Sequence, residues 1–230
     1  MSWVRIPPGA FDFEGEKPDI VNLLRDQDIQ GQEGLTGWMS KSLDEMTDEE
    51  RSQLFPIILS EYKPVWKKNY LKEKAVVEQA IGPHNIVRTS HIGATAVPGL
   101  IAKPTIDILV EIKDGTDTAR LISNMQLGGY RYLEQPKNPP PHMMFIKGYT
   151  MEGFKGQVFH VHVRYSGDWD ELYFRDYLLT HPKTAEEYSK LKWELKQKYE
   201  HDRDTYTDAK TDFIKRVTKL ARAEVKKKRP

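Results

Sequence analysis

The chain has 230 residues, of which 38% are hydrophobic and 30% are charged, and its formal net charge is +1. This length supports one sizeable core with a helical appendage, and the balanced charge gives no general basic surface for nucleic acid. The absence of cysteine excludes disulfides, thiolate zinc sites and cysteine nucleophiles. No apolar stretch approaches the roughly 18 residues of a membrane helix, so we expect a cytoplasmic protein with no membrane partner and no specific nucleic acid.

The first part of the chain has α/β patterning. Residues 1–41 are polar and weakly periodic, so we expect a poorly ordered extension. Thr47 and Glu50 have the spacing of a capping box, which predicts a short helix ending before Pro56. Apolar periodicity and turn residues then predict a strand at 55–59, a helix at 64–81, strands at 86–92 and 105–112, a helix at 116–127, a strand at 130–133, and strands at 142–147 and 157–165 joined by a link at 148–156.

After residue 165 the pattern becomes helical. Helices are predicted at 168–180, from a second capping box at Thr184 to about residue 200, and at 205–226. Residues 226–230 read as a solvated basic tail. The layout predicts one α/β (α+β) domain at 42–225, with a mixed sheet flanked by helices at 42–165 and an antiparallel helical half at 166–225.

The segment from His91 to Asp107 carries the clearest chemical pattern. A strand ends at Gly93 and is followed by the small residues Ala94 and Thr95 and a loop rich in glycine and proline. Small-residue loops admit phosphate to backbone N–H groups, and an aspartate on a nearby strand can hold a divalent cation against it. The pattern favours a nucleotide or phosphate site. The simpler alternative is that Asp107 pairs with a lysine or a turn amide for structural reasons.

The same segment carries a family resemblance. A glycine and small residues, a loop, and then Asp107 on a strand are similar to the motif of the nucleotidyltransferase superfamily. More closely, residues 91–110 resemble the GrpB family (UPF0157 type), an uncharacterised family with that fold. Further stretches with the family's pattern lie at 43–57, 159–163, 174–178, 181–182, 188–192 and 206–210. The resemblance covers about residues 43–223 and implies a nucleotidyltransferase-like fold.

GrpB domains also occur fused to dephospho-coenzyme A kinase, which implies a link to coenzyme A metabolism. The chain has no Gly-x-x-x-x-Gly-Lys-Ser/Thr loop, so the resemblance does not imply the kinase activity.

Two departures from the family pattern weaken the expectation of catalysis. The superfamily usually has a second carboxylate two residues after the first, where this chain has Leu109. Glu111 lies roughly 13 Å along the strand from Asp107, too far to share a metal easily. Ala94 stands where the family usually has serine, which removes one hydroxyl that Thr95 is expected to replace.

Two histidines offer a different ligand set. Strand side chains alternate, so His160 and His162 share the face opposite the apolar residues of their strand. If this strand lies beside the Asp107 strand, as the fold implies, the three side chains form a catalytic and metal-ligating set for Mg or Mn, or for Zn or Fe(II). Alternatively the histidines donate hydrogen bonds to an anion, or they are ordinary polar strand residues.

Several further residues are candidates for phosphate or ligand binding. His91 either orients a ligand or caps the turn, and Lys103 supplies a point charge unless it is a surface lysine. Arg175 and Asp176 form a polar patch. The pairs Tyr188–Lys192 and Tyr206–Lys210 each have i, i+4 spacing, so both could line a nucleotide cleft or form amphipathic surface.

These residues leave three functions open. The first is a nucleotide-binding protein that transfers a nucleotidyl or phosphoryl group with a divalent metal. The second is a non-catalytic domain that binds a nucleotide or coenzyme A precursor, or that assists folding of a partner enzyme. The third is a metal-dependent hydrolase using Asp107, His160 and His162.

Overall fold

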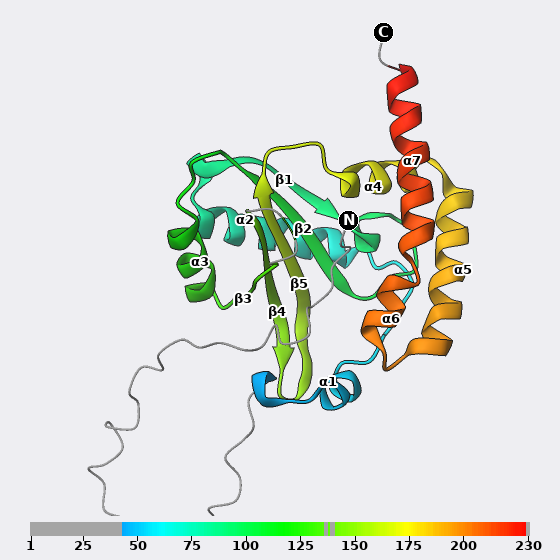
Figure 1. Ribbon diagram of the computed structural model, residues 1–230, viewed down its shortest axis with the longest axis horizontal. Helices are drawn as coiled ribbons and strands as arrows, with labels where there is room; N and C mark the ends of the chain where they lie inside the picture. Colours follow the sequence, from blue (N-terminus) through cyan, green and yellow to red (C-terminus); the bar gives the residue numbers. More distant parts are fainter. Residues whose placement is uncertain (1–42, 136–137, 139–140, 229–230) are drawn as a thin grey trace, which may run out of the picture.

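The computed structural model describes residues 43–135, 138 and 141–228 (Figure 1). The predicted extension at 1–41 and the last two residues of the predicted tail lie outside this range. The described chain forms a five-stranded mixed sheet and seven α-helices. In spatial order the strands are β1 (Ile86–Ile92), β2 (Thr105–Ile112), β5 (Gly153–Tyr165), β4 (His142–Thr150) and β3 (Arg131–Leu133).

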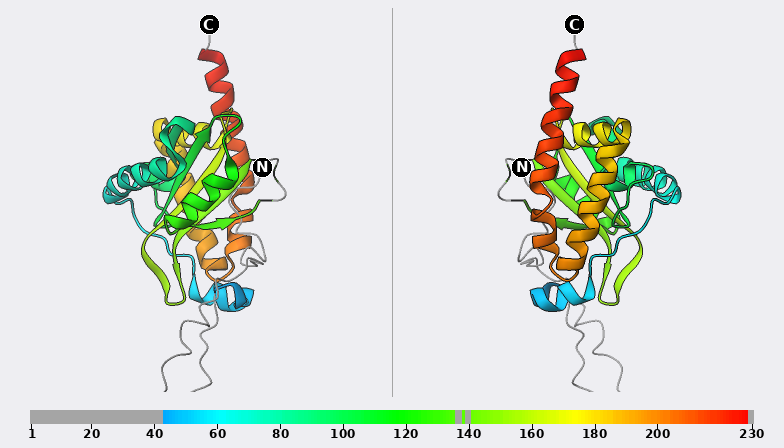
Figure 2. Two further views of the ribbon diagram at one scale, coloured as in Figure 1. Left: turned by 90° about the vertical axis from the view of Figure 1, so that its left-hand side faces the viewer. Right: turned by 90° about the vertical axis from the view of Figure 1, so that its right-hand side faces the viewer.

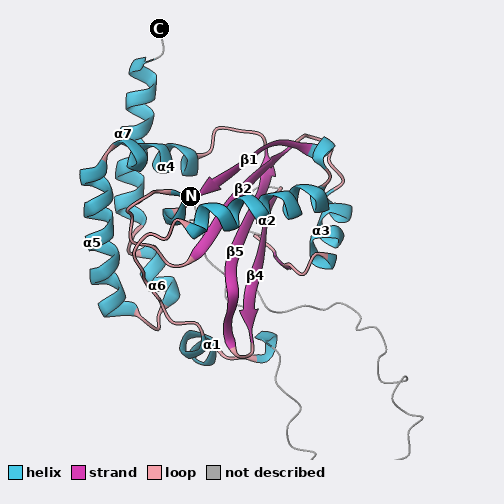
Figure 3. Cartoon of the chain, turned by 180° about the vertical axis from the view of Figure 1, so that it is seen from behind, coloured by secondary structure: helices cyan, strands magenta, loops and turns pink. Residues whose placement is uncertain are grey.

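The helices pack on both sides of this sheet. They are α1 (Asp48–Leu54), α2 (Val65–Ile81), α3 (Thr118–Leu127), α4 (Asp170–Thr180), α5 (Pro182–Tyr199), α6 (Arg203–Asp208) and α7 (Thr211–Lys228). Both side views place α2 and α7 on opposite sides of the sheet (Figure 2). From behind, α2 crosses the strands, and α4 to α7 gather beside β1 and β2 (Figure 3). None of the helices in the described ranges is long and apolar enough to cross a membrane.

Strand β2 fixes the positions of the polar groups. It pairs parallel with β5 and antiparallel with β1, so it lies inside the sheet. Ile106, Ile108, Val110 and Ile112 are fully buried in the main core with residues of α2 and α3. Because strand side chains alternate between faces, Asp107 lies on the opposite face, toward the helical half. The predicted α/β fold, with a mixed sheet followed by a helical half, is confirmed.

The predicted strand at 55–59 is wrong. Nearby, Ser60 makes an isolated bridge with Ala102, and Ile57 donates its backbone N–H to the carbonyl oxygen of Glu200. Ile57 is buried against Leu195 and Tyr206. The apolar residues of this segment therefore pack beneath the helical half, and they do not extend the sheet.

The predicted link at 148–156 is also wrong. Strand β4 continues to Thr150 and β5 begins at Gly153, so the two strands form a long hairpin. Gly148 has a φ of +95° and lies at a shift in register between Lys147 and Tyr149. Its glycine signal marks a β-bulge within the strand. This irregularity re-aims Tyr149 toward the site described below.

The helical half differs from prediction in two places. Helix α5 begins at Pro182 after His181, and Thr184 lies within its first turn. Proline suits the first helical position because its missing N–H needs no partner there. The predicted last helix is two helices, α6 and α7, separated at Ala209 and Lys210. The described part of the predicted basic tail, residues 226–228, continues α7.

Candidate functional site

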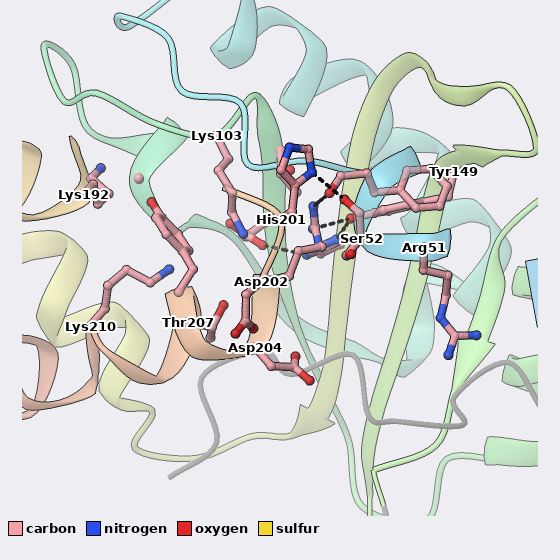
Figure 4. A pocket seen from close by; sticks show the side chains of 18 of the residues that line it. Arg51, Ser52, Lys103, Tyr149, Lys192, His201, Asp202, Asp204, Thr207 and Lys210 are labelled. Carbon is pink, nitrogen blue, oxygen red and sulfur yellow. Dashed lines mark hydrogen bonds and ion pairs between the residues drawn. The ribbon is translucent and has the colours of Figure 1, made fainter. Parts of the chain in front are cut away.

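A cavity of about 500 Å³ opens between the sheet and the helical half (Figure 4). Its wall comes from the loop after β1, from β2, β4 and β5, and from α1, α4, α5, α6 and α7. Nine of the thirteen predicted site residues line it: Gly93, Ala94, Lys103, Asp107, His160, Tyr188, Lys192, Tyr206 and Lys210. The sequence motifs that were separate along the chain therefore meet at one place.

Asp107 and the two histidines lie close together at the sheet. The parallel register pairs Asp107 with His160. The Oδ1 atom of Asp107 lies 3.4 Å from His160 Nδ1 and 3.8 Å from His162 Nε2. The other ring nitrogen of His160 lies 2.8 Å from the hydroxyl of Tyr149, which fixes the orientation of the ring.

These contacts keep Asp107 ionised. Burial alone would raise its pKa, but the hydrogen bonds and electrostatic attraction of His160 and His162 outweigh burial and hold the pKa of Asp107 well below its usual range. Burial lowers the pKa of His160 despite the opposing attraction of Asp107. The site therefore presents a carboxylate beside a neutral imidazole.

Gly93 allows the loop to approach this carboxylate. Its φ is +71° and its ψ is −174°, a region that is essentially restricted to glycine. A Cβ atom at position 93 would lie 2.3 Å from Oδ2 of Asp107, far inside van der Waals contact. The loop can therefore approach the Asp107 carboxylate only because residue 93 has no side chain.

Five cationic side chains line the cavity: Arg51, Lys103, Lys192, Arg203 and Lys210. Five carboxylates also line it: Asp48, Glu49, Asp107, Asp202 and Asp204. The side chains of Lys192 and Lys210 are buried, with exposed fractions of 3% and 8%. Lys192 donates a hydrogen bond to the carbonyl oxygen of Ile101. Neither Lys103 nor Lys210 forms an ion pair within the part of the chain that the structure describes.

The environment disfavours the charged form of these lysines. Burial is the main cause, and the neighbouring cations add to it. The pKa of Lys210 is lowered to about 8, and the pKa values of Lys103 and Lys192 are lowered well below the usual range of lysine. Asp107 opposes the shift for Lys103 and Lys210. Around Lys103, Asp107 is the carboxylate that faces Lys192, Arg203 and Lys210, which makes an added anion favourable there.

Aromatic rings form another part of the wall. The ammonium group of Lys192 lies 4.5 Å from the centroid of the Tyr188 ring, and that of Lys210 lies 4.2 Å from the Tyr206 ring. Phe174 packs edge-to-face on Tyr188 at 5.3 Å. The hydroxyl of Tyr206 is buried and has no hydrogen-bond partner among the described residues. Both predicted Tyr–Lys pairs therefore face the cavity and do not form surface.

Four predicted residues lie outside the cavity lining. His91 contacts the hydroxyl of Thr95 at 3.0 Å, and Thr95 donates to the carbonyl oxygen of Thr105. Arg175 donates to the carbonyl oxygen of His91 and pairs with Asp176. His162 lies behind the cavity wall against Asp107. The Thr95 hydroxyl is engaged in the fold and does not replace the missing serine hydroxyl beside a ligand.

His91 gives a test of this packing at acid pH. Burial lowers the pKa of His91 to about 4, against the attraction of Asp107 and with a smaller lowering contribution from Arg175. A pKa below the unfolded value means that the unfolded chain binds more protons between about pH 4 and pH 6.5, so stability falls as the pH drops through that window. We expect His91→Gln to shrink this loss.

The measurement is the free energy of unfolding in urea at about pH 7 and about pH 4.5. His84→Gln is the matched control because His84 is exposed. Equal acid sensitivity in the wild type and His91→Gln would contradict the role of His91. Burial also lowers the pKa of His142 to about 4, so part of the loss of stability at acid pH remains in both variants.

Sequence reasoning missed Tyr149 and Arg203, which also line the cavity. Arg203 donates to the carbonyl oxygen of Phe55 at 2.9 Å and to the Tyr149 hydroxyl at 3.4 Å. Tyr149 enters the site through the bulge at Gly148, and Arg203 is the first residue of α6. A glycine inside an alternating strand pattern is a signal for such a bulge, but no comparable signal marks Arg203.

Helix α1 and the start of α6 form the mouth of the cavity. Figure 4 shows Arg51 and Tyr149 toward one end, and Lys192 and Lys210 toward the other. Ser52 also lines the mouth, and its carbonyl oxygen lies 3.2 Å from His201 Nδ1. The stretch 43–57, which resembles the family, includes α1, but no residue of α1 was predicted to belong to the site.

The site does not fit a two-metal centre. Leu109 occupies the position of the second carboxylate and is fully buried against Ile92 and Leu172. Glu111 is paired with Arg88 and accepts a hydrogen bond from Gly167. Across the described residues, no group of three or more His, Asp or Glu side chains could hold a metal ion. What the donor set does fit is a single cation held by Asp107 together with the oxygens of a ligand.

Comparison with known proteins identifies the family. A family model described as "GrpB protein" matches residues 56–220. The chain belongs to the GrpB family. A UPF0157 protein of Pseudomonas aeruginosa is 34% identical over 171 residues, which are 74% of this chain and 67% of that protein. The glutamate-rich protein GrpB of Alkalihalophilus pseudofirmus is 33% identical, with 70% of this chain and 93% of that protein covered.

A solved structure supports the fold of this GrpB-family chain. The crystal structure of conserved protein GrpB from Enterococcus faecalis matches with a TM-score of 0.64 and 30% sequence identity. The match covers 73% of this chain and 99% of that one. The shared region includes the sheet and most of the helical half, whereas α1 precedes the part that the family model matches.

Proposed function

We propose that this GrpB-family protein binds a phosphorylated small molecule of the nucleotide class in the cavity. The observation that carries the proposal is the local charge around Lys103, where Lys192, Arg203 and Lys210 lie near the single carboxylate of Asp107. Neither Lys103 nor Lys210 makes an ion pair with a described residue. A buried excess charge is costly unless a counter-ion accompanies it. A phosphate group supplies that charge and accepts hydrogen bonds from several donors at once.

The nucleotide class is favoured by the rest of the lining. The cavity volume of about 500 Å³ lies within the usual range for small-molecule sites. The rings of Phe174, Tyr188 and Tyr206 give it an aromatic wall, and aromatic rings stack well on bases. The nucleotidyltransferase-like interpretation of the fold, the link to coenzyme A metabolism and a cytoplasmic location belong to this proposal and rest on the sequence motifs.

Binding without transfer is the form that the site supports best. The second carboxylate position is filled by Leu109, whose side chain belongs to a small core cluster, so no second metal ligand is available there. A role in assisting a partner's folding stays a prediction. The hydrolase alternative needs Asp107, His160 and His162 together as metal ligands, and the described residues provide no such cluster.

Group transfer with one Mg²⁺ or Mn²⁺ is the second candidate. It is favoured by the ionised carboxylate of Asp107 beside the Gly93 loop, within the cavity wall. Magnesium is commonly held by one or two carboxylates together with substrate phosphates. When bound, such an ion neutralises charge on the phosphate oxygens. Asp107 would hold it, and the lysines would orient the phosphates.

A thermal-shift panel tests both candidates. The protein is heated with inorganic phosphate, nucleoside mono-, di- and triphosphates and coenzyme A precursors, with and without Mg²⁺ or Mn²⁺. We expect stabilisation by at least one phosphorylated compound, because a ligand that binds only the folded state raises its stability. No shift with any compound, at concentrations up to millimolar, would refute the binding proposal.

Asp107→Asn separates binding from metal-assisted chemistry. Asparagine keeps the size of the side chain and removes its charge. If a metal takes part, we expect the extra stabilisation by Mg²⁺ or Mn²⁺ to disappear in Asp107→Asn, while the metal-independent part remains. A metal effect of equal size in both proteins would exclude Asp107 as the ligand.

A further inference from the structure

Tyr149 is paired with a histidine in the cavity wall. Its hydroxyl lies 2.8 Å from Nε2 of His160, and on the other side of the ring Oδ1 of Asp107 lies 3.4 Å from Nδ1. All three residues line the cavity. A hydroxyl, an imidazole and a carboxylate in this order are the arrangement of a nucleophile, its base and the group that orients the base.

The carboxylate decides which group donates in this row. The ionised carboxylate of Asp107 only accepts hydrogen bonds, so the His160 tautomer that suits it carries its hydrogen on Nδ1. Nε2 then keeps its lone pair, and the Tyr149 hydroxyl is the donor in their hydrogen bond. A proton that leaves Tyr149 therefore has an acceptor already in place, and the imidazolium that forms lies beside a negative charge.

The ring of Tyr149 is held on its other sides. It packs edge-to-face against Phe55 and Phe154, with 5.1 Å and 5.4 Å between ring centroids. The register shift at Gly148 immediately precedes it. A Cβ atom at position 148 would lie 2.9 Å from the carbonyl oxygen of Gln157, so this irregularity requires glycine. The strand thus gives up a regular ladder at the point where the hydroxyl reaches His160.

Cationic groups lie beside the same hydroxyl. Nη2 of Arg203 donates to the Tyr149 oxygen at 3.4 Å, while Nη1 is anchored to the carbonyl oxygen of Phe55 at 2.9 Å. Lys103 lines the same wall and acts electrostatically on His160. A phosphate at the Tyr149 hydroxyl therefore meets fixed positive charge, which also stabilises the charge that develops on its oxygens when it is attacked.

From this arrangement we propose that Tyr149 is a nucleophile that accepts the terminal phosphoryl group of a nucleoside triphosphate bound in the cavity, with His160 as its base and Asp107 as the residue that positions the base. The proposal rests on the proposed function, because the cationic groups must first hold the phosphates. The Tyr149 oxygen forms a bond to phosphorus, and the bond from phosphorus to the bridging oxygen breaks. The proton of Tyr149 moves to Nε2 and then to the leaving nucleoside diphosphate. The step is redox-neutral and leaves a phosphotyrosine.

The first test uses diisopropyl fluorophosphate, a phosphorus electrophile that loses fluoride and leaves a stable adduct. The full-length protein is treated near neutral pH, digested and mapped by peptide mass spectrometry. We expect the adduct on Tyr149. Tyr62, a half-buried tyrosine outside the cavity lining that packs on Trp66, is the internal reference. Because a positioned base contributes about 10²–10⁴-fold to a rate, Tyr149 should react at least about a hundredfold faster than Tyr62.

Three variants test the role of each group. Tyr149→Phe should abolish the adduct at this position. His160→Ala should slow the labelling of Tyr149 to the rate of Tyr62, and added imidazole should restore part of it by accepting the proton in the vacated space. Asp107→Asn should slow the labelling without a response to imidazole, because the His160 ring still fills its place. All three variants should keep the thermal stabilisation by inorganic phosphate, which general damage to the fold would remove.

Nucleoside triphosphates test the transfer itself. The protein is incubated with each of them and Mg²⁺, and tryptic peptides are searched for phosphotyrosine. We expect a phosphoryl group on Tyr149 with at least one of these compounds and none on Tyr62. Inorganic phosphate should slow this reaction and the fluorophosphate labelling, because it occupies the same cationic groups. Mapping in the wild type does not depend on whether any variant folds.

The outcomes separate the nucleophile from the binding site. Stabilisation by phosphorylated compounds with no adduct on Tyr149, equal labelling of Tyr149 and Tyr62, or wild-type labelling in His160→Ala would overturn the nucleophile and leave the binding proposal standing. A fluorophosphate adduct on Tyr149 without phosphotyrosine from any nucleoside triphosphate, or labelling that is insensitive to phosphate, would overturn the transfer from a bound nucleotide. Absence of both labelling and stabilisation would refute both proposals.

Discussion

Gly93→Ala is expected to lower the stability of the protein by about 3–5 kcal/mol and to remove ligand binding. The backbone strain at a glycine-only φ and ψ contributes about 1–3 kcal/mol. The remainder comes from the new Cβ, which would lie 2.3 Å from Oδ2 of Asp107 and must displace that carboxylate. In a domain of about 150–250 residues each kcal/mol shifts the melting temperature by roughly 2–4 °C, so the fall should be about 10 °C.

Gly99→Ala is the matched control in the same loop. Gly99 also has a positive φ, of +79°, but a Cβ there meets no heavy atom within 4 Å. It therefore carries the backbone penalty without the collision, and we expect a loss of only about 1–2 kcal/mol with ligand binding retained. Denaturant unfolding and the thermal-shift panel measure both effects. Equal losses in the two variants would show that the fit between Gly93 and Asp107 has no energetic role.

Lys210→Met is expected to change ligand affinity and unliganded stability in opposite directions. Losing one charge-assisted contact to phosphate costs about 1.5–3 kcal/mol, which is roughly a 10- to 100-fold weaker dissociation constant. The unliganded protein should gain about 1–3 kcal/mol, because a buried ammonium without an ion-pair partner is replaced by an apolar side chain of similar length. Isothermal titration calorimetry and urea unfolding measure the two quantities.

The pH dependence of stability and of phosphate affinity is an independent test of the role of Lys210. The pKa of Lys210 is lowered to about 8 by burial and by Arg203, against Asp107. The unfolded chain therefore binds more protons between about pH 8 and pH 10.5, so wild-type stability should rise with pH in that window while phosphate affinity falls. Lys210→Met should lose this part of both trends.

Lys215→Met is the control on the adjacent helix α7, since Lys215 is exposed. It should leave affinity and stability within about 0.5 kcal/mol of the wild type. If Lys210→Met lowers affinity and stability together, the lysine is a structural contact and not an uncompensated charge kept for a ligand.

The site was predictable wherever local periodicity controls geometry. The alternation of β2 and β5 places Asp107, His160 and His162 on one face, and the i, i+4 spacing of the Tyr–Lys pairs directs them to one side of their helices. Tyr149 was not predicted because Gly148 was interpreted as the end of a strand when it is a bulge within one. Tertiary packing also overrides local pattern at Ile57, which the sequence predicts to lie in a strand but which is buried beneath the helical half.

The break between α6 and α7 was likewise not predicted from the sequence. Residues 205–226 have no proline or glycine, so the pattern predicted one helix, yet the chain turns at Ala209 and Lys210. The packing of Tyr206 beneath Ile57 and Leu195, the cap at Asp202 and the bond from Arg203 to Phe55 hold α6 in position. The sequence therefore identified Tyr206 and Lys210 as a pair, but it could not show that the pair spans a junction between two helices.

The position of α1 bears on how ligand selectivity could diverge within the family. Asp48, Glu49, Arg51 and Ser52 line the mouth of the cavity, and all four precede residue 56, where the family match begins. The deep part of the cavity, with Asp107 and the three lysines, lies within the shared region. Substitutions in α1 would therefore alter the entrance of the cavity and leave the side chains of its deep part in place.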